Sequence, residues 1–192
     1  LLESRVPLDG LNNKTVALTT ASATSVVLLR VILEIFSGVN PDFMLYEQGV
    51  EDPYEQADAV LTIGDLAIKR TLSPRFPLTY DLGEIWHRHT GLPFVFALWQ
   101  VNYKKNIEQD LGKLYDILME SKRYGMARLS ELAERHAADF GIPAETLLRY
   151  WNLFSYDLGP EEQKGLLAYY GYAAELGAID AVPELRVWGR QV

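Results

Sequence analysis

The feature that most constrains the fold is an alternation of short β-branched runs and apolar helical stretches in the first third of the chain. The run KTVALTT (14–20) passes directly into SATSVVLLRVILEIFSG (22–38), which has helical character and ends at a glycine. DFMLYE (42–47) and DAVLTIG (58–64) are strand-like, and DLAIKR (65–70) begins another helix. A strand–helix–strand order of this kind predicts a parallel sheet with helices on its faces.

The rest of the chain is expected to be mostly helical. In DLGEIWHRHTG (81–91), an aspartate stands where a helix would begin and a glycine where it would end. PFVFALWQV (93–101) is a continuous apolar run, which predicts a second buried strand. Apolar residues then recur at helical spacing, so residues 103–192 are predicted to be almost entirely helical.

Composition excludes several classes of protein. The chain has 192 residues, enough for one large domain or two small lobes. Its formal net charge of −8 argues against a nucleic-acid partner, since phosphate binding needs a basic face. The absence of cysteine excludes disulfides, thiolate nucleophiles and thiolate metal sites. No apolar run approaches the ~18 residues that a membrane helix needs, so no membrane partner is predicted.

The histidines do not form a metal site in the sequence pattern. His87 and His89 are two residues apart, and on a helix they would point about 200° from each other. Zinc needs three or four converging ligands, which this pair does not supply. His136 falls on the apolar face of a later helix and is predicted to be a packed core residue. Glycine-rich phosphate loops and the nucleophile elbow are absent from the sequence, so neither a metal nor a cofactor is predicted.

Three tyrosines gather on the last long helical stretch, at Tyr169, Tyr170 and Tyr172. Aromatic clusters of this kind are typical of helix–helix packing. They are therefore assigned to the core, with no ligand role.

Hydroxyl side chains are concentrated where the first predicted strand meets the first predicted helix. The stretch TTASATS contains Thr20, Ser22, Thr24 and Ser25. One interpretation is helix capping, in which a hydroxyl accepts a hydrogen bond from a backbone N–H that lacks a helical partner. The other is a binding site for a carboxylate or phosphate, because free N–H groups, the helix dipole and several hydroxyl donors meet there. The residues alone leave both interpretations open.

A second candidate lies at the junction of the strand 58–64 with the next helix. Gly64 and Asp65 stand at the carboxyl end of this strand, the edge at which open α/β sheets bind their ligands. The simpler interpretation is that Gly64 makes a tight turn and Asp65 caps the helix.

Four segments of the chain, taken together, resemble one enzyme family. They are, in order, KTVALTTASATSVVLLRVIL, ADAVLTIGDLAI, YDLGEIWHRHTGLPFVFALW and YDLGPEEQKGLLAYYGYAAELGAI. In order and spacing they resemble the chorismate dehydratase family, which acts in the futalosine route to menaquinone. The pattern DLGxxW followed by TGLPFVFAxW is the most specific part, and the resemblance covers nearly the whole chain.

This resemblance implies an α/β fold like that of type II periplasmic binding proteins, with two lobes joined by crossover strands and the ligand between them. Residues 10–90 are then expected to form the second lobe. Residues 1–9 and 91–192 supply the hinge strands and the helical remainder of the first lobe, with PFVFALWQ as the returning crossover. The strands that begin the first lobe are expected to precede Leu1 and so to lie outside this sequence.

The reaction that the resemblance implies is the loss of water from chorismate, giving 3-[(1-carboxyvinyl)oxy]benzoate, without a metal or redox cofactor. The substrate carries two carboxylates, so the hydroxyl-rich helix end at 20–25 is expected to bind one of them. No residue is assigned as the proton acceptor. A cytoplasmic enzyme is expected, with chorismate as its small-molecule partner; the oligomeric state is not predicted.

Two alternatives remain open at this point. The sister enzyme of the same pathway, 1,4-dihydroxy-6-naphthoate synthase, shares the fold, but its crossover is closer to TGLPLPLGGN than to the TGLPFVFALW found here. A solute-binding protein that performs no chemistry is the other, because a fold alone does not define an activity.

Overall fold

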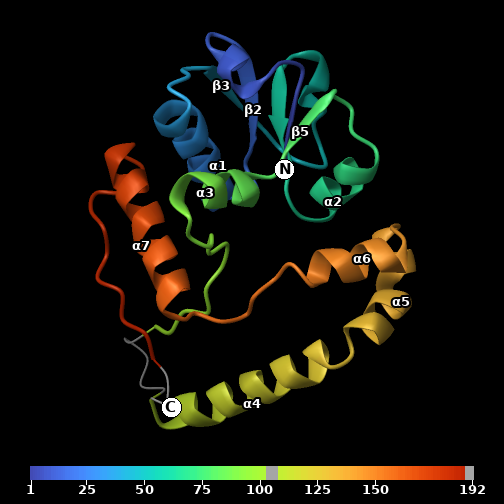
Figure 1. The fold of residues 1–192 in the computed structure, drawn as a ribbon, viewed down its shortest axis with the longest axis vertical. Coiled ribbons are helices and arrows are strands. Elements are labelled where there is room, and N and C mark those ends of the chain that lie inside the picture. The colour runs from blue at the N-terminus through green and yellow to red at the C-terminus, as the bar shows by residue number, and fades with distance from the viewer. Residues whose placement is uncertain (103–107, 189–192) are drawn as a thin grey trace. The chain divides into compact units, whose positions relative to one another are not determined.

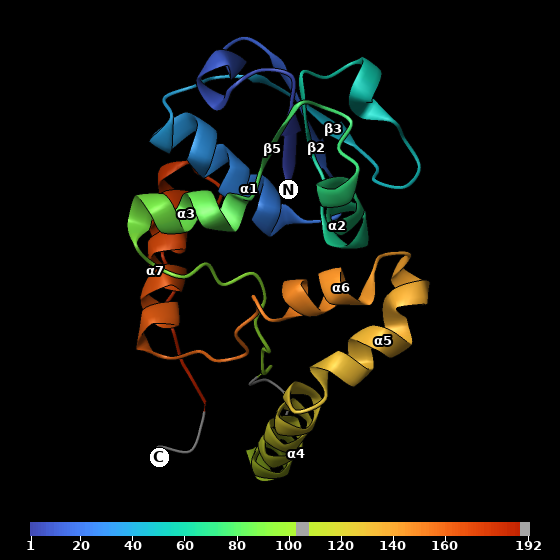
Figure 2. The same cartoon turned by 45° about the vertical axis from the view of Figure 1, so that its right-hand side comes forward.

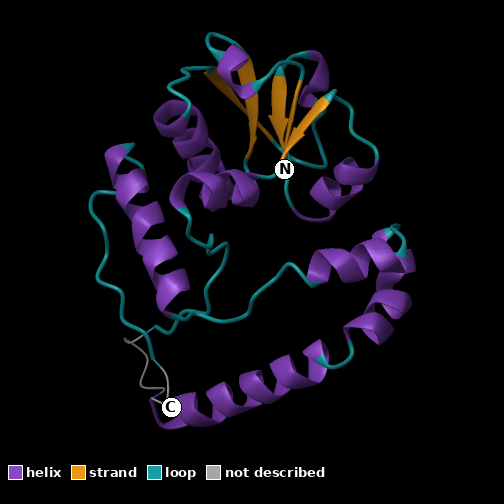
Figure 3. Ribbon diagram, in the orientation of Figure 1, coloured by secondary structure: helices purple, strands orange, loops and turns teal. Residues whose placement is uncertain are grey.

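The computed structural model describes residues 1–102 and 108–188 of the chain. The chain forms two compact units. The first consists of Leu1–Phe96 with Leu158–Glu184, and the second of Ala97–Asp157 with Leu185–Val192. The first contains the sheet and the candidate site, and the described part of the second is helical (Figure 3).

A mixed five-stranded sheet lies at the centre of the first unit, with the strand order β3-β2-β4-β1-β5. Its strands are β1 (Leu2–Ser4), β2 (Thr15–Thr19), β3 (Asp42–Tyr46), β4 (Ala59–Leu61) and β5 (Leu78–Tyr80). β2 pairs in parallel with both β3 and β4, which confirms the predicted parallel sheet. β1 runs antiparallel to both of its neighbours, β4 and β5.

Helices cover both faces of this sheet (Figures 1 and 2). The α-helices of the first unit are α1 (Ala23–Arg30), α2 (Gly64–Leu72), α3 (Leu82–Thr90) and α7 (Pro160–Glu175), with short 3₁₀ turns η1 (Leu8–Leu11) and η3 (Pro53–Glu55). Alternation along β2 sends Val16 and Leu18 to the face that packs against α1, α3 and α7. Ala17 points to the opposite face, toward η3.

The helix predicted over 22–38 is present, but it changes its hydrogen-bond pattern half-way. α1 continues without a break into a π-helical segment, η2 (Val31–Phe36). At its end the N–H of Ser37 donates to the carbonyl of Ile32, 3.0 Å away, a span of five residues. The wider turn keeps Val31, Ile32 and Leu33 fully buried in succession.

Helix α3 begins and ends as its sequence predicts. The carboxylate of Asp81 accepts hydrogen bonds from the N–H groups of Gly83 and Glu84, at 2.7 and 3.1 Å. Gly91 ends the helix in the left-handed conformation, with φ = 71°. Trp86 of this helix is fully buried and makes edge-on contacts with Tyr169 and Tyr172 of α7. These contacts confirm the core role predicted for the tyrosines.

The strand predicted over 93–101 is not observed, so this prediction was wrong. Residues 93–102 are described by the structure and join no sheet. The aromatic character that predicted a strand serves helix packing instead, because Phe94 contacts both Trp86 and Tyr169 edge-on, with ring centroids 5.4 and 5.1 Å away. Next to it, the carbonyl of Pro93 lies directly against Gly165 of α7.

The second unit contains α4 (Glu108–Met126), α5 (Leu129–Phe140) and α6 (Ala144–Trp151), which confirms the predicted helical character of this part of the chain. Residues 152–157 and 185–188 are described and are not helical, so the prediction of an almost entirely helical segment was too broad. Residues 103–107 and 189–192 lie outside the described residues. Large apolar side chains remain exposed here, including Ile117 at 62%, Tyr124 at 61% and Leu153 at 77%. Among the described helices, none combines the length and the hydropathy that crossing a membrane requires.

The approach of Pro93 to α7 gives a direct test of the packing. A Cβ added at Gly165 would overlap the carbonyl oxygen of Pro93, and backbone cannot move aside as a flexible side chain does. We expect Gly165→Ala to lower the free energy of unfolding by about 2 kcal/mol, the usual cost of overpacking. Urea denaturation measures this change.

Gly171 of the same helix is the matched control, because a Cβ there meets no atom within 4 Å. Gly171→Ala is expected to raise the free energy of unfolding by up to about 1 kcal/mol, since alanine favours the helix. Equal effects of the two substitutions would contradict the close packing of α7 on Pro93.

Candidate active site

The candidate site lies at the end of the sheet where β2 and β4 finish, called the edge below. β2 and β4 are parallel neighbours, with Val16 opposite Ala59 and Ala17 opposite Val60. Their carboxyl ends therefore lie at the same edge. The hydroxyl stretch 20–25 follows β2, and Gly64–Asp65 follow β4, so the structure brings both sequence-predicted groups to this edge.

Ser22 caps helix α1. Its Oγ accepts a hydrogen bond from the backbone N–H of Ser25 at 3.2 Å and lies 3.0 Å from the Ser25 Oγ. Its backbone is extended, as an N-cap residue requires. The capping interpretation therefore holds for Ser22, and the two serine hydroxyls already interact with each other.

The threonines of this stretch have separate roles. Thr19 is buried, and its Oγ1 accepts from the N–H of Ala21 at 3.1 Å, which fixes the turn between β2 and α1. Thr20 is exposed, and its N–H donates to the carbonyl of Tyr46 on β3 at 3.1 Å. Thr24 is half-buried in the first turn of α1, and its carbonyl accepts from the hydroxyl of Tyr169 at 3.3 Å. α7 thus contacts the helix end that faces the candidate site.

Gly64 and Asp65 form the first turn of α2, and both are exposed. Gly64 has φ = 61°, a conformation that few residues with a Cβ adopt, so its role in a tight turn is confirmed. The predicted cap at Asp65 was wrong, because the N-cap position belongs to Ile63, which offers no side-chain hydrogen bond. The carboxylate of Asp65 instead lies near the positive end of the helix dipole.

The histidines play no part in this edge. In residues 1–102 and 108–188, no group of three or more His, Cys, Asp or Glu side chains is placed to hold a metal ion. The core position predicted for His136 was wrong, since its side chain is 42% exposed and its Nδ1 lies 3.0 Å from Asp139. Helix α5 buries Ala133 on its inner face instead, so its apolar face is narrower than the sequence indicated.

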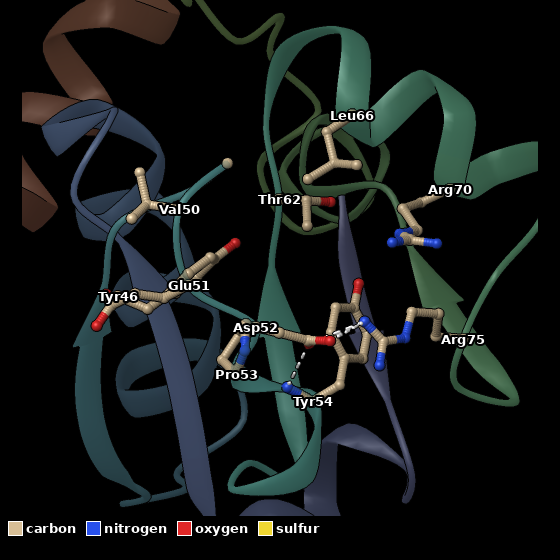
Figure 4. Close-up of a pocket in the computed structure, with 11 residues that line it drawn as sticks. Tyr46, Val50, Glu51, Asp52, Pro53, Tyr54, Thr62, Leu66, Arg70 and Arg75 are labelled. Atoms are coloured by element: carbon tan, nitrogen blue, oxygen red, sulfur yellow. Dashed lines mark hydrogen bonds and ion pairs between the residues drawn. The ribbon is translucent and has the colours of Figure 1, made fainter.

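A hollow of about 300 Å³ lies beside the edge, between the loop after β3 and α2 (Figure 4). Its lining includes Thr62 at the end of β4, with Arg70 and Arg75. Arg75 makes a bidentate ion pair with Asp52 at 2.8 and 2.9 Å, and the hydrogen bond lowers the pKa of that carboxyl. Arg70 faces the carboxylate of Glu3 at 3.7 Å. Because both arginines already face a carboxylate, the hollow has little surplus positive charge for an anionic ligand.

Glu3 is the buried carboxylate on which this cluster is built. It lies on β1 with a fully buried side chain, and its oxygens accept from the hydroxyl of Tyr54 and from the backbone N–H of Arg75 at 2.6 Å. The guanidinium of Arg75 also stacks on the Tyr54 ring, 3.9 Å from its centroid. A buried charge needs such partners, so Glu3 links β1 to η3, to α2 and to the loop before β5.

The tyrosines around the site are held in their neutral form. Burial and then the charge of Glu3 raise the pKa of Tyr46 to about 12. Burial followed by the hydrogen bond to Glu3 raises the pKa of Tyr54 as well, and burial raises the pKa of Tyr169 to about 12. Near neutral pH all three therefore act as hydrogen-bond donors and not as bases.

Comparison with known proteins assigns the chain to a family. A family model described as menaquinone biosynthesis matches residues 1–175. The chain belongs to this menaquinone biosynthesis family. A relative named chorismate dehydratase, from Thermus thermophilus, is 38% identical over 170 residues, which cover 80% of this chain. The chain spans about 60% of the length of that relative.

Within this member of the menaquinone biosynthesis family, sequence reasoning found the edge residues but missed the side chains that support them. Three such side chains carry no motif that marks them: the buried Glu3, Tyr46, whose hydroxyl donates to the Leu61 carbonyl, and Gln48, whose carboxamide hydrogen-bonds the backbone of Ile63. The one signal in the sequence is that Glu3 is a charged residue inside the otherwise apolar start LLES. Its partners Tyr54 and Arg75 lie 51 and 72 residues further along the chain.

The buried carboxylate gives a stability test. Glu3→Gln keeps the shape of the side chain but removes its charge and places an N–H₂ group among donors. We expect the free energy of unfolding to fall by about 3 kcal/mol, as when one partner of a buried ion pair is lost. Chemical denaturation at neutral pH measures the change.

Glu84→Gln is the control, because Glu84 pairs with Arg88 on the surface, where both side chains are 68% exposed. Its effect is expected to stay within about 0.5 kcal/mol. Two equally small effects would show that the Glu3 cluster does not support the fold.

Proposed function

We propose that the full-length protein is a chorismate dehydratase. It removes water from chorismate and forms 3-[(1-carboxyvinyl)oxy]benzoate, a step of menaquinone biosynthesis. The observation that carries the proposal is the identity of 38% to a relative of that name over 80% of the chain, within a matching family. As an enzyme of biosynthesis acting on a small soluble substrate, it is proposed to work in the cytoplasm.

The proposed substrate site is the sheet edge, formed by Thr20, Ser22, Thr24, Ser25, Gly64 and Asp65. The first turn of α1 offers backbone N–H groups, the positive end of a helix dipole and the Thr24 hydroxyl, which together favour a carboxylate. Each charge-assisted hydrogen bond there contributes about 1.5–3 kcal/mol. Asp65 would repel a carboxylate, so we assign it to a substrate hydroxyl, for which it is an acceptor.

The proposed chemistry needs little more than positioning. A ring carbon loses its proton and a neighbouring carbon loses its hydroxyl, so that one water leaves and the ring becomes aromatic. Aromatisation drives the reaction, and the site has to hold a dicarboxylate in one orientation and exclude water. We assign the proton acceptor to no residue of this chain.

We also propose the two-lobed arrangement of type II periplasmic binding proteins for the full-length protein, with residues 10–90 as the second lobe. Residues 1–9 and 91–192 supply the hinge strands and the helical remainder of the first lobe, with α7 packed against the second. Two observations support it. β1 enters the sheet antiparallel between β4 and β5, as a strand does when it arrives from a separate body. The exposed Ile117, Tyr124 and Leu153 of the helical unit would be covered by such a body. A structure of the full-length protein checks this division.

Turnover of chorismate tests the activity. The full-length protein is expected to convert chorismate into a product with a benzenoid ultraviolet spectrum and a mass lower by one water. The reaction should proceed without added nucleotide or metal and should be insensitive to a chelator. Binding of chorismate without any conversion would instead show a solute-binding protein, and formation of 1,4-dihydroxy-6-naphthoate by a protein that leaves chorismate unconverted would show the sister enzyme.

Substitution of the edge hydroxyls tests the site. Thr24→Ala is expected to lower kcat/KM for chorismate by about tenfold to a hundredfold, the loss of one charge-assisted hydrogen bond, and to change stability little. Ser22→Ala is the comparison, because Ser22 caps α1 and its loss should lower the free energy of unfolding by about 1 kcal/mol. Steady-state kinetics and urea denaturation of both variants measure these effects. An unchanged kcat/KM in Thr24→Ala would remove this hydroxyl from the site.

A further inference from the structure

One side chain makes a pair of hydrogen bonds to the backbone immediately before the candidate edge. The Oε1 of Gln48 accepts from the N–H of Ile63 at 3.0 Å, and its Nε2 donates to the Ile63 carbonyl, also at 3.0 Å. Gln48 belongs to the loop after β3, whereas Ile63 follows β4 and directly precedes Gly64. The carboxamide therefore takes the place of a neighbouring strand and fixes both polar groups of one residue.

The loop that carries Gln48 is closed on itself. The N–H groups of Val50 and Glu51 both donate to the carbonyl of Glu47, at 3.1 and 2.9 Å. The carboxylate of Glu51 in turn accepts from the N–H of Glu47. Gly49 adopts φ = 91°, which the tight turn requires. Gln48 is thus presented by a short, internally bonded turn.

Tyr46 connects this loop to both strands of the site. Its carbonyl accepts from the N–H of Thr20, just after β2, and its hydroxyl donates to the carbonyl of Leu61, the last residue of β4, at 2.7 Å. Figure 4 shows Tyr46 beside the loop residues Val50 and Glu51, with Thr62 across the hollow. One short segment of the chain, Tyr46 to Gln48, therefore holds the ends of β2 and β4 at a fixed separation.

The start of helix α2 is weakly held by its own residues. Its N-cap residue, Ile63, has no side chain that can accept a hydrogen bond, and its carbonyl accepts a long helical bond from the N–H of Ala67, at 3.4 Å. Gly64 follows in the left-handed conformation. The two bonds from Gln48 are the side-chain contacts that the structure records at Ile63. Without them, the turn at Gly64–Asp65 has greater freedom to move relative to Thr20–Ser25.

We propose that Gln48 is a positioning residue for substrate binding: its carboxamide holds Ile63 and so sets the distance between the Gly64–Asp65 turn and the first turn of α1. This rests on the proposed function of the edge. Gln48 touches no substrate itself. Loss of the Gln48 carboxamide is expected to change KM more than kcat. The Gly64–Asp65 turn and the first turn of α1 both bind the substrate, and neither is assigned to proton transfer.

The experiment compares Gln48→Met and Gln48→Glu in the full-length protein. Methionine keeps the length of the side chain and loses both hydrogen bonds. Glutamate keeps the acceptor for the Ile63 N–H but places a negative oxygen against the Ile63 carbonyl. We expect KM for chorismate to rise about tenfold in both variants, with kcat changed less than about threefold. A lower melting temperature with KM unchanged would overturn the proposal.

Hydrogen exchange at backbone amides gives a readout that does not depend on activity. The amide of Ile63 donates to Gln48, and the amide of Ala67 donates to the Ile63 carbonyl. In Gln48→Met, both are expected to exchange about tenfold faster, while those of Val16 and Ala17 in β2 stay protected. Unchanged exchange at Ile63 and Ala67 would show that Gln48 does not hold this turn. Faster exchange with an unchanged KM would show that it holds the turn but does not position substrate, which also overturns the proposal.

Gln56→Met is the matched control. Gln56 lies eight residues further on, at the end of η3, with an exposed side chain. The Gln56→Met variant should leave KM and amide exchange at Ala67 unchanged. Failure of the proposed function has a separate signature: wild-type protein that leaves chorismate unconverted, with exchange at Ala67 still dependent on Gln48.

Discussion

Parallel pairing of β2 with β4 is the constraint on which the site depends. Parallel strands bring their carboxyl ends to one edge of a sheet, and each of these two strands is followed directly by the amino end of a helix. Two groups of polar residues more than 35 positions apart in the sequence therefore share one edge of the sheet. Neither α1 nor α2 needs a special motif for this, because the strand–helix order alone places their first turns there.

The two faces of the sheet are stabilised by different kinds of interaction. On one face, the aromatic cluster around Trp86 joins α3, α7 and Phe94 through apolar contact and edge-on ring packing. On the other face, a buried carboxylate, two guanidinium groups and the hydroxyl of Tyr54 form a charged cluster under η3. The charged face depends on each of its partners, because a buried charge that loses one costs several kcal/mol.

The sequence predicted the parts of the molecule that depend on local pattern. The parallel strands, the extent of the helix after β2 and the caps of α3 follow from periodicity and capping residues over short stretches. The strand predicted over 93–101 was wrong because an apolar stretch can pack against helices as well as join a sheet. Only tertiary contacts decide between a strand and an irregular segment packed on helices. The antiparallel β1, the burial of Glu3 and the exposure of His136 also depend on partners that are distant in the sequence or on how wide the buried face of a helix is.

For the candidate site, residue types and topology predicted where the polar groups lie, whereas the support from Gln48 arises from a side chain reaching across to another strand. No periodicity marks such a contact. The cap predicted at Asp65 failed because α2 has its N-cap at Ile63, two residues earlier, with Gly64 in the left-handed conformation directly after it. Only the backbone conformation reveals this start.

The placement of β1 has a consequence for how the chain folds. β2, α1 and β3 are consecutive and can pair soon after they are made, since their contacts are local. β1 comes first in the sequence, yet its partners are Leu61 and Tyr80, about 60 and 80 residues later, opposite Leu2. Long-range pairing of this kind is slow because a large loop must close before any contact forms. The first strand of this sheet is therefore expected to be among the last to join it, and during that interval the edge of β4 that it covers stays open to other strands.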